Sequence, residues 1–313
     1  MDLLLRCKYN LLLRCKYNNK KNNIKIKELL KNNKINDDMI GFQDDKGYSA
    51  LIWACYHENT EIVKLLLNTG NAHPEYQTKE GNSALILVCK HNKGIYSHSV
   101  VKLLLATGNA HPEYQNNWGD SALIWACYHE NTEIVKLLLN TGNAHPEYQT
   151  KLGNSALIWA CFDNKIVIVK LLLATGNAHP EYQNMDGNSA LIYACKNNNT
   201  EIVKLLLATG NAHPEYRDYQ NHLAIYYANA SIRKYIKLYK FICVVEKLKL
   251  ILKVVGVFKN YDKGKPYSCE MFYLMGLDGI FPDENIDIKD NIKNKINLLQ
   301  LKFMKLGCEE FIK

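Results

Sequence analysis

The block Gly-x-Ser-Ala-Leu recurs along this chain and constrains its fold more than any other feature. Its serine falls at Ser49, Ser83, Ser121, Ser155 and Ser189, at spacings of 34, 38, 34 and 34 residues. Each block leads into an apolar run that reaches a cysteine. A second apolar run follows, and each unit closes with Gly-Asn-Ala-His-Pro-Glu-Tyr. A fixed period of this length indicates a repeat architecture, so we expect one supersecondary unit per period.

The residues of the first unit predict a helix, a turn, a second helix and an extended arm. Ser49 is suited to cap the first helix, and Asn59 with Thr60 ends that helix and begins the next. Gly70 fits the left-handed residue that ends a helix. Pro74 is expected to move His73 toward an extended conformation, so that the arm leaves as a strand or hairpin. Neither helix is long enough to be stable alone, so each must pack against the neighbouring copy.

Residues 44–54 read Asp-Asp-Lys-Gly-Tyr-Ser-Ala-Leu-Ile-Trp-Ala. In spacing they resemble the D-x-x-G-x-T-P-L-H-x-A pattern of the ankyrin repeats, and the later Glu-Ile-Val-Lys-Leu-Leu-Leu is similar to that family too. Serine, alanine and isoleucine replace the family's threonine, proline and histidine, and the unit has one residue more than the usual 33. The resemblance implies an all-α ankyrin-repeat solenoid of helix-turn-helix units with short β-hairpin arms.

The predicted organisation has four parts. Residues 1–43 form a basic N-terminal segment with a degenerate capping repeat, and residues 44–217 form five full ankyrin repeats. Residues 218–241 form a second degenerate capping repeat, and residues 242–313 form a basic, helical C-terminal segment. The near-identity of the copies and the abundance of Asn, Lys and Ile resemble the multiplied ankyrin proteins of giant DNA viruses of amoebae.

The net charge of +8 is unevenly distributed. Residues 1–36 carry ten basic and two acidic side chains, residues 37–230 carry thirteen and nineteen, and residues 231–313 carry sixteen and ten. An acidic middle therefore lies between two basic ends. The early apolar stretch is interrupted by charges and lacks the hydrophobic core of a signal peptide. We expect an intracellular, cytoplasmic protein, in a host cell if it is viral, and a nuclear location stays open.

Five histidines, beginning with His73, and five cysteines, beginning with Cys55, recur at fixed places in the repeat. Neighbouring repeats stack about 8–10 Å apart, whereas zinc binds its ligand nitrogens at about 2.0–2.1 Å. Equivalent side chains therefore cannot share an ion, and we interpret both sets as structural. The chain has no phosphate loop, nucleophile elbow or His-Glu-x-x-His motif. We expect no enzymatic activity, no catalytic or metal-binding residues and no cofactor.

Positions that differ among otherwise identical copies are free to serve recognition. In ankyrin proteins the matching places lie on the hairpin tips and the inner helix face, and the resemblance implies a partner-binding surface there. The candidates before the glycine are Asp45, Lys46, Lys79, Glu80, Asn117, Trp118, Lys151, Leu152, Met185, Asp186 and Tyr219. The candidates after the cysteine are Tyr56, His57, Lys90, His91, Tyr128, His129, Phe162, Asp163, Lys196 and Asn197. Trp53, Trp125, Trp159 and Tyr193 recur at one helix position and are predicted to be core.

The predicted function is a non-enzymatic, monomeric scaffold that binds another protein through the hairpin tips and the concave inner-helix face. Its partner is not identified by the sequence, and no small-molecule substrate is expected. Two alternatives stay open. The basic ends could bind nucleic acid or an anionic membrane electrostatically. The resemblance to viral ankyrin proteins, some of which end in an F-box-like segment, implies that residues 242–313 could recruit a ubiquitin ligase, although no matching motif is present.

Overall fold

The computed structural model describes residues 11–17, 19–31, 37–91, 97–237 and 239–240. The chain divides into two compact units, residues 1–232 and 233–313. The first unit contains the repeats and is described below. The C-terminal segment 242–313 lies outside the described residues.

Each repeat is a pair of antiparallel helices followed by an arm. Residues 11–16 form the first inner helix. The later inner helices are α4 (Ala50–Tyr56), α6 (Ala84–His91), α8 (Ala122–Tyr128), α10 (Ala156–Phe162), α12 (Ala190–Lys196) and α14 (Ala224–Tyr227). The outer helices are α2 (Lys20–Lys31), α5 (Thr60–Leu67), α7 (Ser97–Leu105), α9 (Thr132–Leu139), α11 (Ile166–Ala174) and α13 (Thr200–Ala208). A short helix, α3 (Asp37–Ile40), precedes the first complete arm, and residues 230–237 are helical after α14.

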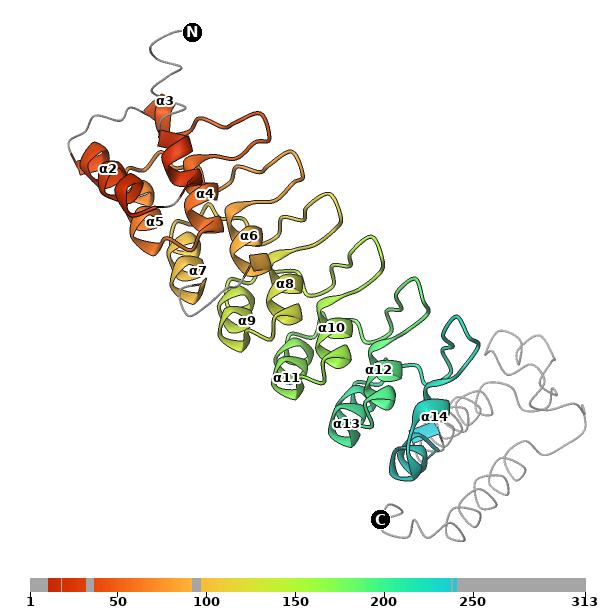
Figure 1. Ribbon diagram of the computed structural model, residues 1–313. Helices are drawn as coiled ribbons and strands as arrows, with labels where there is room; N and C mark the ends of the chain where they lie inside the picture. The colour runs from red at the N-terminus through yellow and green to blue at the C-terminus, as the bar shows by residue number, and fades with distance from the viewer. Residues whose placement is uncertain (1–10, 18, 32–36, 92–96, 238, 241–313) are drawn as a thin grey trace, which may run out of the picture. The chain divides into compact units, whose positions relative to one another are not determined.

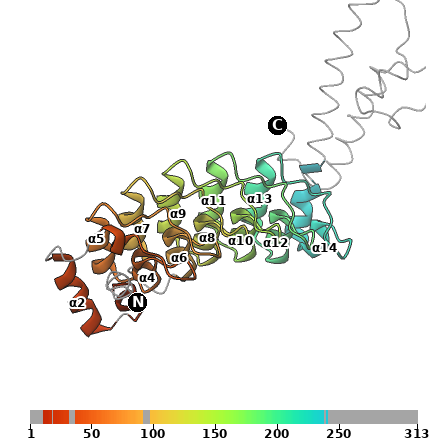
Figure 2. The ribbon, with the colours of Figure 1, turned by 90° about the horizontal axis from the view of Figure 1, so that it is seen from above.

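The helices stack in two rows, which Figures 1 and 2 show side by side. Each inner helix packs against the inner helix of the next repeat, from α4 through α14, and each outer helix does the same from α2 through α13. Within a repeat the two helices also contact each other, as α4 and α5 do. The stack confirms that short helices here are stabilised by their neighbours rather than alone.

The predicted caps are confirmed. The Ser49 hydroxyl accepts a hydrogen bond from the Ile52 amide at 3.2 Å, and the Asn59 side chain accepts one from Ile62 at 3.2 Å. Gly70 has φ +80° after α5, the left-handed conformation that glycine adopts without penalty. These local signals recur in most repeats, whereas α11 and α14 begin after Lys165 and Leu223 without a side-chain cap.

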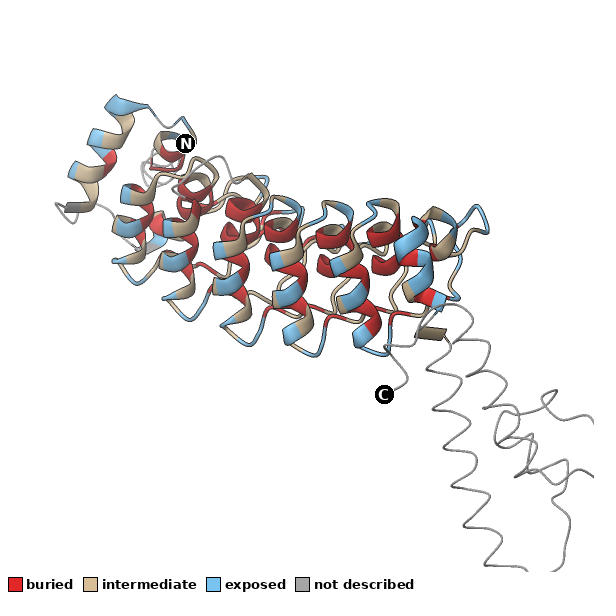
Figure 3. Cartoon of the chain, turned by 90° about the horizontal axis from the view of Figure 1, so that it is seen from below, coloured by how far each residue is buried: buried red, intermediate tan, exposed pale blue. Residues whose placement is uncertain are grey.

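The core lies between the two rows and between successive repeats, as the buried faces in Figure 3 show. Leu51, Ile52, Ile62 and Leu66 are almost fully buried in the first complete repeat, and the same positions are buried in the later ones. Cys55 and its equivalents are buried with them. The identical residues of the copies therefore form the shared interface of the stack.

The arm departs from the predicted conformation at His73. This residue has φ +49°, so the expectation of an extended conformation before Pro74 is wrong, and the four equivalent histidines also have positive φ. The left-handed conformation starts a tight turn in which the Tyr76 amide donates to the His73 carbonyl at 3.2 Å. The His73 ring stacks on Tyr76 at 4.4 Å, and its Nδ1 lies 2.7 Å from a Glu75 oxygen. These contacts offset the strain of the backbone.

Candidate functional site

The candidate site begins at the hairpin tips. A single antiparallel bridge closes each hairpin, such as the one between Gln43 and Ser49. Inside it, the Asp44 carboxylate accepts hydrogen bonds from the amides of Lys46 and Tyr48 at 3.0 and 2.9 Å. This turn directs the two residues before the glycine into solvent. All the predicted tip residues, from Asp45 to Tyr219, are exposed.

Backbone hydrogen bonds join each tip to the next one. The Lys79 amide donates to the Lys46 carbonyl at 2.9 Å, and the Lys151 amide donates to the Trp118 carbonyl at 2.8 Å. The equivalent bonds run from Asn117 to Glu80, from Met185 to Leu152 and from Tyr219 to Asp186. Glycine is needed for this close approach, because a Cβ on Gly47 would lie 2.9 Å from backbone atoms of the next hairpin. The tips therefore form a continuous row in fixed register.

The chemistry of the tip row changes along the chain. Its first two tips carry only charged pairs, Asp45-Lys46 and Lys79-Glu80. The next four tips each carry a large apolar or aromatic residue: Trp118, Leu152, Met185 and Tyr219, which are 47%, 61%, 74% and 72% exposed. A contiguous row of this kind is typical of a protein interface. We call these four residues the apolar tip row.

The first residue after each cysteine covers the next repeat. Lys16, Lys90 and Lys196 place their ammonium groups over the rings of Trp53, Trp125 and Tyr227, at 5.4, 5.3 and 4.6 Å from the centroids. These distances are within the range of cation–π attraction.

Two aromatic residues occupy the same place in other repeats. Tyr128 meets Trp159 edge to face at 4.9 Å, and Phe162 meets Tyr193 at 5.2 Å. Tyr56 instead contacts His91, because the following repeat has Leu87 where the others have an aromatic residue. Variation at this position is therefore coupled to packing between repeats.

The second residue after the cysteine bonds to the preceding inner helix. Nε2 of His57 lies 2.7 Å from the Lys16 carbonyl oxygen, and Nε2 of His129 lies 2.7 Å from that of Lys90. Asn197 donates to the carbonyls of Cys161 and Phe162 at 2.9 and 2.8 Å. These donors satisfy carbonyl groups at helix C-termini, which lack partners within the helix.

Asp163 breaks this pattern, because an ionised carboxylate can only accept hydrogen bonds. Partial burial raises the pKa of Asp163, and repulsion from Glu130 raises it further, while Lys165 acts in the opposite direction. Lys165 itself pairs with Glu130 at 2.5 Å. The repeat that contains Asp163 thus has a negative charge where three other repeats have a donor.

The recurring aromatic residues are not core, contrary to the prediction. Trp53, Trp125, Trp159 and Tyr193 are half-buried, and their rings lie along the inner helices. Trp159 contacts Tyr128 on one side and Phe162 on the other, at 4.9 and 5.7 Å. Apolar periodicity could not distinguish these residues from the core, because a side chain on the rim of a packed helix face has the same spacing as one in its centre.

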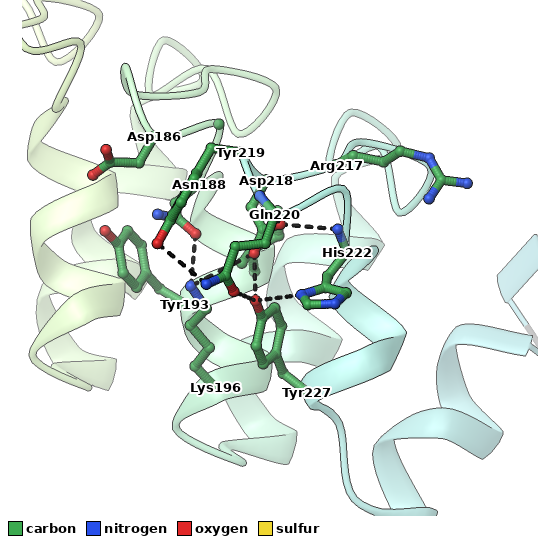
Figure 4. Close-up of polar contacts among 12 residues, drawn as sticks. Asp186, Asn188, Tyr193, Lys196, Arg217, Asp218, Tyr219, Gln220, His222 and Tyr227 are labelled. Carbon is green, nitrogen blue, oxygen red and sulfur yellow. Dashed lines mark hydrogen bonds and ion pairs between the residues drawn. The ribbon is translucent and has the colours of Figure 1, made fainter.

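A polar network closes the described end of the array, as Figure 4 shows. The Lys196 ammonium donates to Asn188 at 2.8 Å and lies 3.9 Å from the Asp218 carboxylate. The Tyr227 hydroxyl donates to Asp218, and this bond raises the pKa of Tyr227 to about 12. Burial acts to raise the pKa of Asp218, but the bonds from Tyr227 and the His222 amide lower it overall. The network joins the last consensus repeat to the degenerate one.

The recurring histidines of the arms have structural contacts. Each Nδ1 lies 2.6–2.7 Å from the glutamate two residues later. Partial burial acts to raise the pKa of Glu75, but the hydrogen bond with His73 lowers it overall. Within the described ranges, no group of three or more His, Cys, Asp or Glu side chains is arranged to hold a metal ion.

The six described cysteines are free and buried thiols: Cys15, Cys55, Cys89, Cys127, Cys161 and Cys195. Burial raises the pKa of each of them, to about 12 for Cys15 and Cys195. A thiol with so high a pKa carries little thiolate and is a poor nucleophile.

The basic ends fall mostly beyond the described part of the chain, so the alternatives based on them stay predictions. Of the N-terminal basic residues, Lys25 pairs with Glu28 and Lys27 with Glu61, at 3.1 and 2.5 Å. No helix in the described segments combines the length and hydropathy needed to cross a bilayer.

The geometry defines a class of protein: a solenoid of stacked helix pairs with a row of hairpin tips along one side. The family description "Ankyrin repeats (3 copies)" matches residues 11–109, 94–184 and 168–247. The chain therefore belongs to the ankyrin-repeat family, whose domains are generally protein–protein interaction modules.

Among the solved structures that are similar to this chain are two ankyrin repeat domains. One is the ankyrin repeat domain of Bcl-3, described as a unique member of the IkappaB protein family. It is 27% identical, with a TM-score of 0.54, and the match covers 71% of this chain and 94% of that one. The human ASB11 ankyrin repeat domain is 24% identical, with a TM-score of 0.53, covering 68% and 90%. No curated protein sequence matches the chain as a relative.

Proposed function

We propose that this chain is a non-enzymatic scaffold that binds a partner protein through its hairpin tips and the adjoining inner-helix face. The apolar tip row carries the proposal. Four large side chains, 47–74% exposed, lie on consecutive tips. Backbone hydrogen bonds of 2.8–2.9 Å between the tips fix their relative positions. Such a preorganised surface loses little conformational entropy on binding.

The two predicted groups of site residues have different places in this function. The tip residues are the proposed anchors, because their side chains face solvent. The residues after the cysteines form the floor beside them, where Tyr128 and Phe162 are still 42% and 48% exposed. His57, His129 and Asn197 contribute by holding adjacent repeats together.

An intracellular location and a giant-virus origin belong to this proposal as well. The buried free thiols are consistent with a reducing compartment. The near-identity of the repeats and the Asn- and Lys-rich composition support the viral origin.

The test is capture of partners from host-cell extract with the full chain and with the variant Trp118→Ala, Leu152→Ala, Met185→Ala, Tyr219→Ala. We expect proteins retained by the parent chain to be lost from the variant, since hot-spot anchors each contribute more than about 1 kcal/mol. Helical content should not change, because the four side chains are exposed. Ile24→Ala with Val167→Ala is the matched control, since both side chains are about half exposed on outer helices. Equal capture by the parent chain and the tip variant would contradict the proposal.

A further inference from the structure

Where the following repeat has an aromatic residue on its inner helix, the packing of one repeat on the next occurs in two chemical forms. In the first form a lysine of this chain lies over the aromatic ring of the following repeat, as Lys90 lies over Trp125 at 5.3 Å. In the second form an aromatic residue occupies the place of the lysine, as Tyr128 does before Trp159 and Phe162 does before Tyr193. The second form occurs at the first two of the three junctions between the repeats of the apolar tip row.

At the junctions that carry a lysine, the aromatic rings of the inner helices hold a cation of the chain itself. Lys90 lies 5.5 Å from the ring of Trp118 on a tip and 5.3 Å from the ring of Trp125 on an inner helix. One ammonium group therefore contacts the tip and the floor together. Lys196 lies over two inner-helix rings, those of Tyr193 and Tyr227. An aromatic ring attracts a cation through the negative charge of its face.

The central junctions lack such a cation of their own. We call Tyr128, Trp159 and Phe162 the central aromatic step. Within the part of the chain that the structure describes, no lysine or arginine lies over these three rings. Both Tyr128 and Phe162 are among the exposed aromatic residues, so the step is open to a partner.

The same place carries unbalanced negative charge. Asp163 follows Phe162 directly and replaces the donor found in the repeats of His57, His129 and Asn197. Glu130 is close enough to repel Asp163, and one lysine, Lys165, pairs with Glu130. Residues 37–230 as a whole carry six more acidic than basic side chains. Charge complementarity therefore favours a basic partner here.

We infer that the central aromatic step, with Asp163 and Glu130 beside it, binds a lysine or arginine side chain from a basic segment of the partner protein. The apolar residues flanking that cation in the partner would contact Leu152 and Met185 on the adjoining tips. The partner's cation would lie against the exposed rings of Tyr128 and Phe162, the residues that replace Lys90 and Lys196 at these two junctions. This inference rests on the proposed function and specifies the chemistry of the partner.

The test uses a random library of 12-residue peptides displayed on phage and selected on the full chain. We expect enriched sequences to combine lysine or arginine with apolar residues. A selected peptide, fluorescently labelled, should lose about tenfold in affinity when its basic residue is changed to glutamine, a change of about 1.4 kcal/mol. This measurement needs no variant of the protein. The affinity should also fall as salt is raised.

The variant Phe162→Lys supplies the missing cation from the chain itself, as in the repeats of Lys90 and Lys196. We expect this variant to bind the peptide about tenfold more weakly and to keep the melting temperature of the parent chain. Val167→Lys is the matched control, since it adds the same charge to an exposed apolar site on the outer helix α11, and its affinity should stay within about twofold. Equal affinities of the two lysine variants would overturn the inference.

Selection of acidic or uncharged peptides, or of none, would also overturn it. If such peptides lose binding to the quadruple tip variant, the proposed function stands and the inference about basic partners fails. If partner capture is also independent of the tips, both fail.

Discussion

The hairpin tips and the residues after the cysteines both vary among the repeats, the tips more so, but they contact different surroundings. At the tips, Leu152 and Met185 project into solvent from turns whose hydrogen bonds come from the backbone and from neighbouring residues such as Thr150 and Asn184, not from the varied side chains themselves. On the inner helices, Phe162 packs against Tyr193, and His129 bonds to a carbonyl of the preceding repeat. At the tips, therefore, a residue can differ among copies without altering the packing between repeats. On the inner helices, a different residue makes a different contact with the neighbouring repeat. Sequence variation alone does not identify a binding residue.

Thiol reactivity should show the largest difference between the two regions. In the variant Leu152→Cys, the introduced thiol lies on an exposed tip, whereas Cys161 is buried and burial raises its pKa. We expect iodoacetamide at pH 8 to modify the introduced thiol at least about a hundredfold faster than Cys161, on the order of the difference in thiolate fraction and access. Peptide mass spectrometry over time measures both rates. Comparable rates of modification of the two thiols in the folded variant would mean that the inner helices open easily.

Truncation of side chains should give the next largest difference. Trp159→Ala removes a half-buried ring from between Tyr128 and Phe162, and we expect it to lower the free energy of unfolding by about 2 kcal/mol. Leu152→Ala should change it by less than about 0.5 kcal/mol, because the side chain is exposed. Urea unfolding followed by circular dichroism measures both. If the two variants are equally stable, the distinction between floor and tips is wrong.

Replacement of Asp163 by a neutral hydrogen-bond donor should give the smallest of these effects on stability. Asp163→Asn restores a hydrogen-bond donor like that of Asn197, and we expect it to raise the free energy of unfolding by about 1 kcal/mol at pH 7. Because the folded pKa of Asp163 is raised, the parent chain loses stability as pH rises from the unfolded value of about 3.9 through the folded one. The advantage of the variant should therefore grow over that range and then level off.

Thermal unfolding of the parent chain and the variant between pH 3.5 and 7 tests this expectation. Asp186→Asn is the matched control, since Asp186 is an exposed carboxylate on a tip, and it should have no effect at any pH. A gain that is independent of pH would show that the charge of Asp163 does not oppose folding.

Much of the fold followed from residues whose effects are local. Ser49 and Asn59 accept hydrogen bonds from amides three residues later, so their spacing is sufficient to place the helix starts. Gly70 ends its helix because of its own conformational freedom. His73 was predicted incorrectly because its conformation depends on contacts with Glu75 and Tyr76 within a folded arm.

The candidate site was predictable only in part. The varied pairs marked the tips correctly as exposed positions, because the turn that presents them is encoded next to them in the sequence. The role of Lys90 over two rings could not be predicted, since Trp118 and Trp125 belong to the following repeat. The same holds for the bond from His129 to the Lys90 carbonyl, which joins residues 39 positions apart.

The sequence by itself determined the repeat, the helix boundaries, the buried cysteines and the exposed tips of this ankyrin-repeat protein. Each of these depends on interactions within one unit or on periodicity that is identical in every unit. Only the tertiary structure decided which variable residues are free of packing contacts, because this depends on which side chains of the neighbouring repeat lie beside them. It also distinguished the aromatic junctions at Tyr128 and Phe162 from those that carry a lysine. The physical reason is that a residue's exposure depends on the neighbouring repeat as well as on its own.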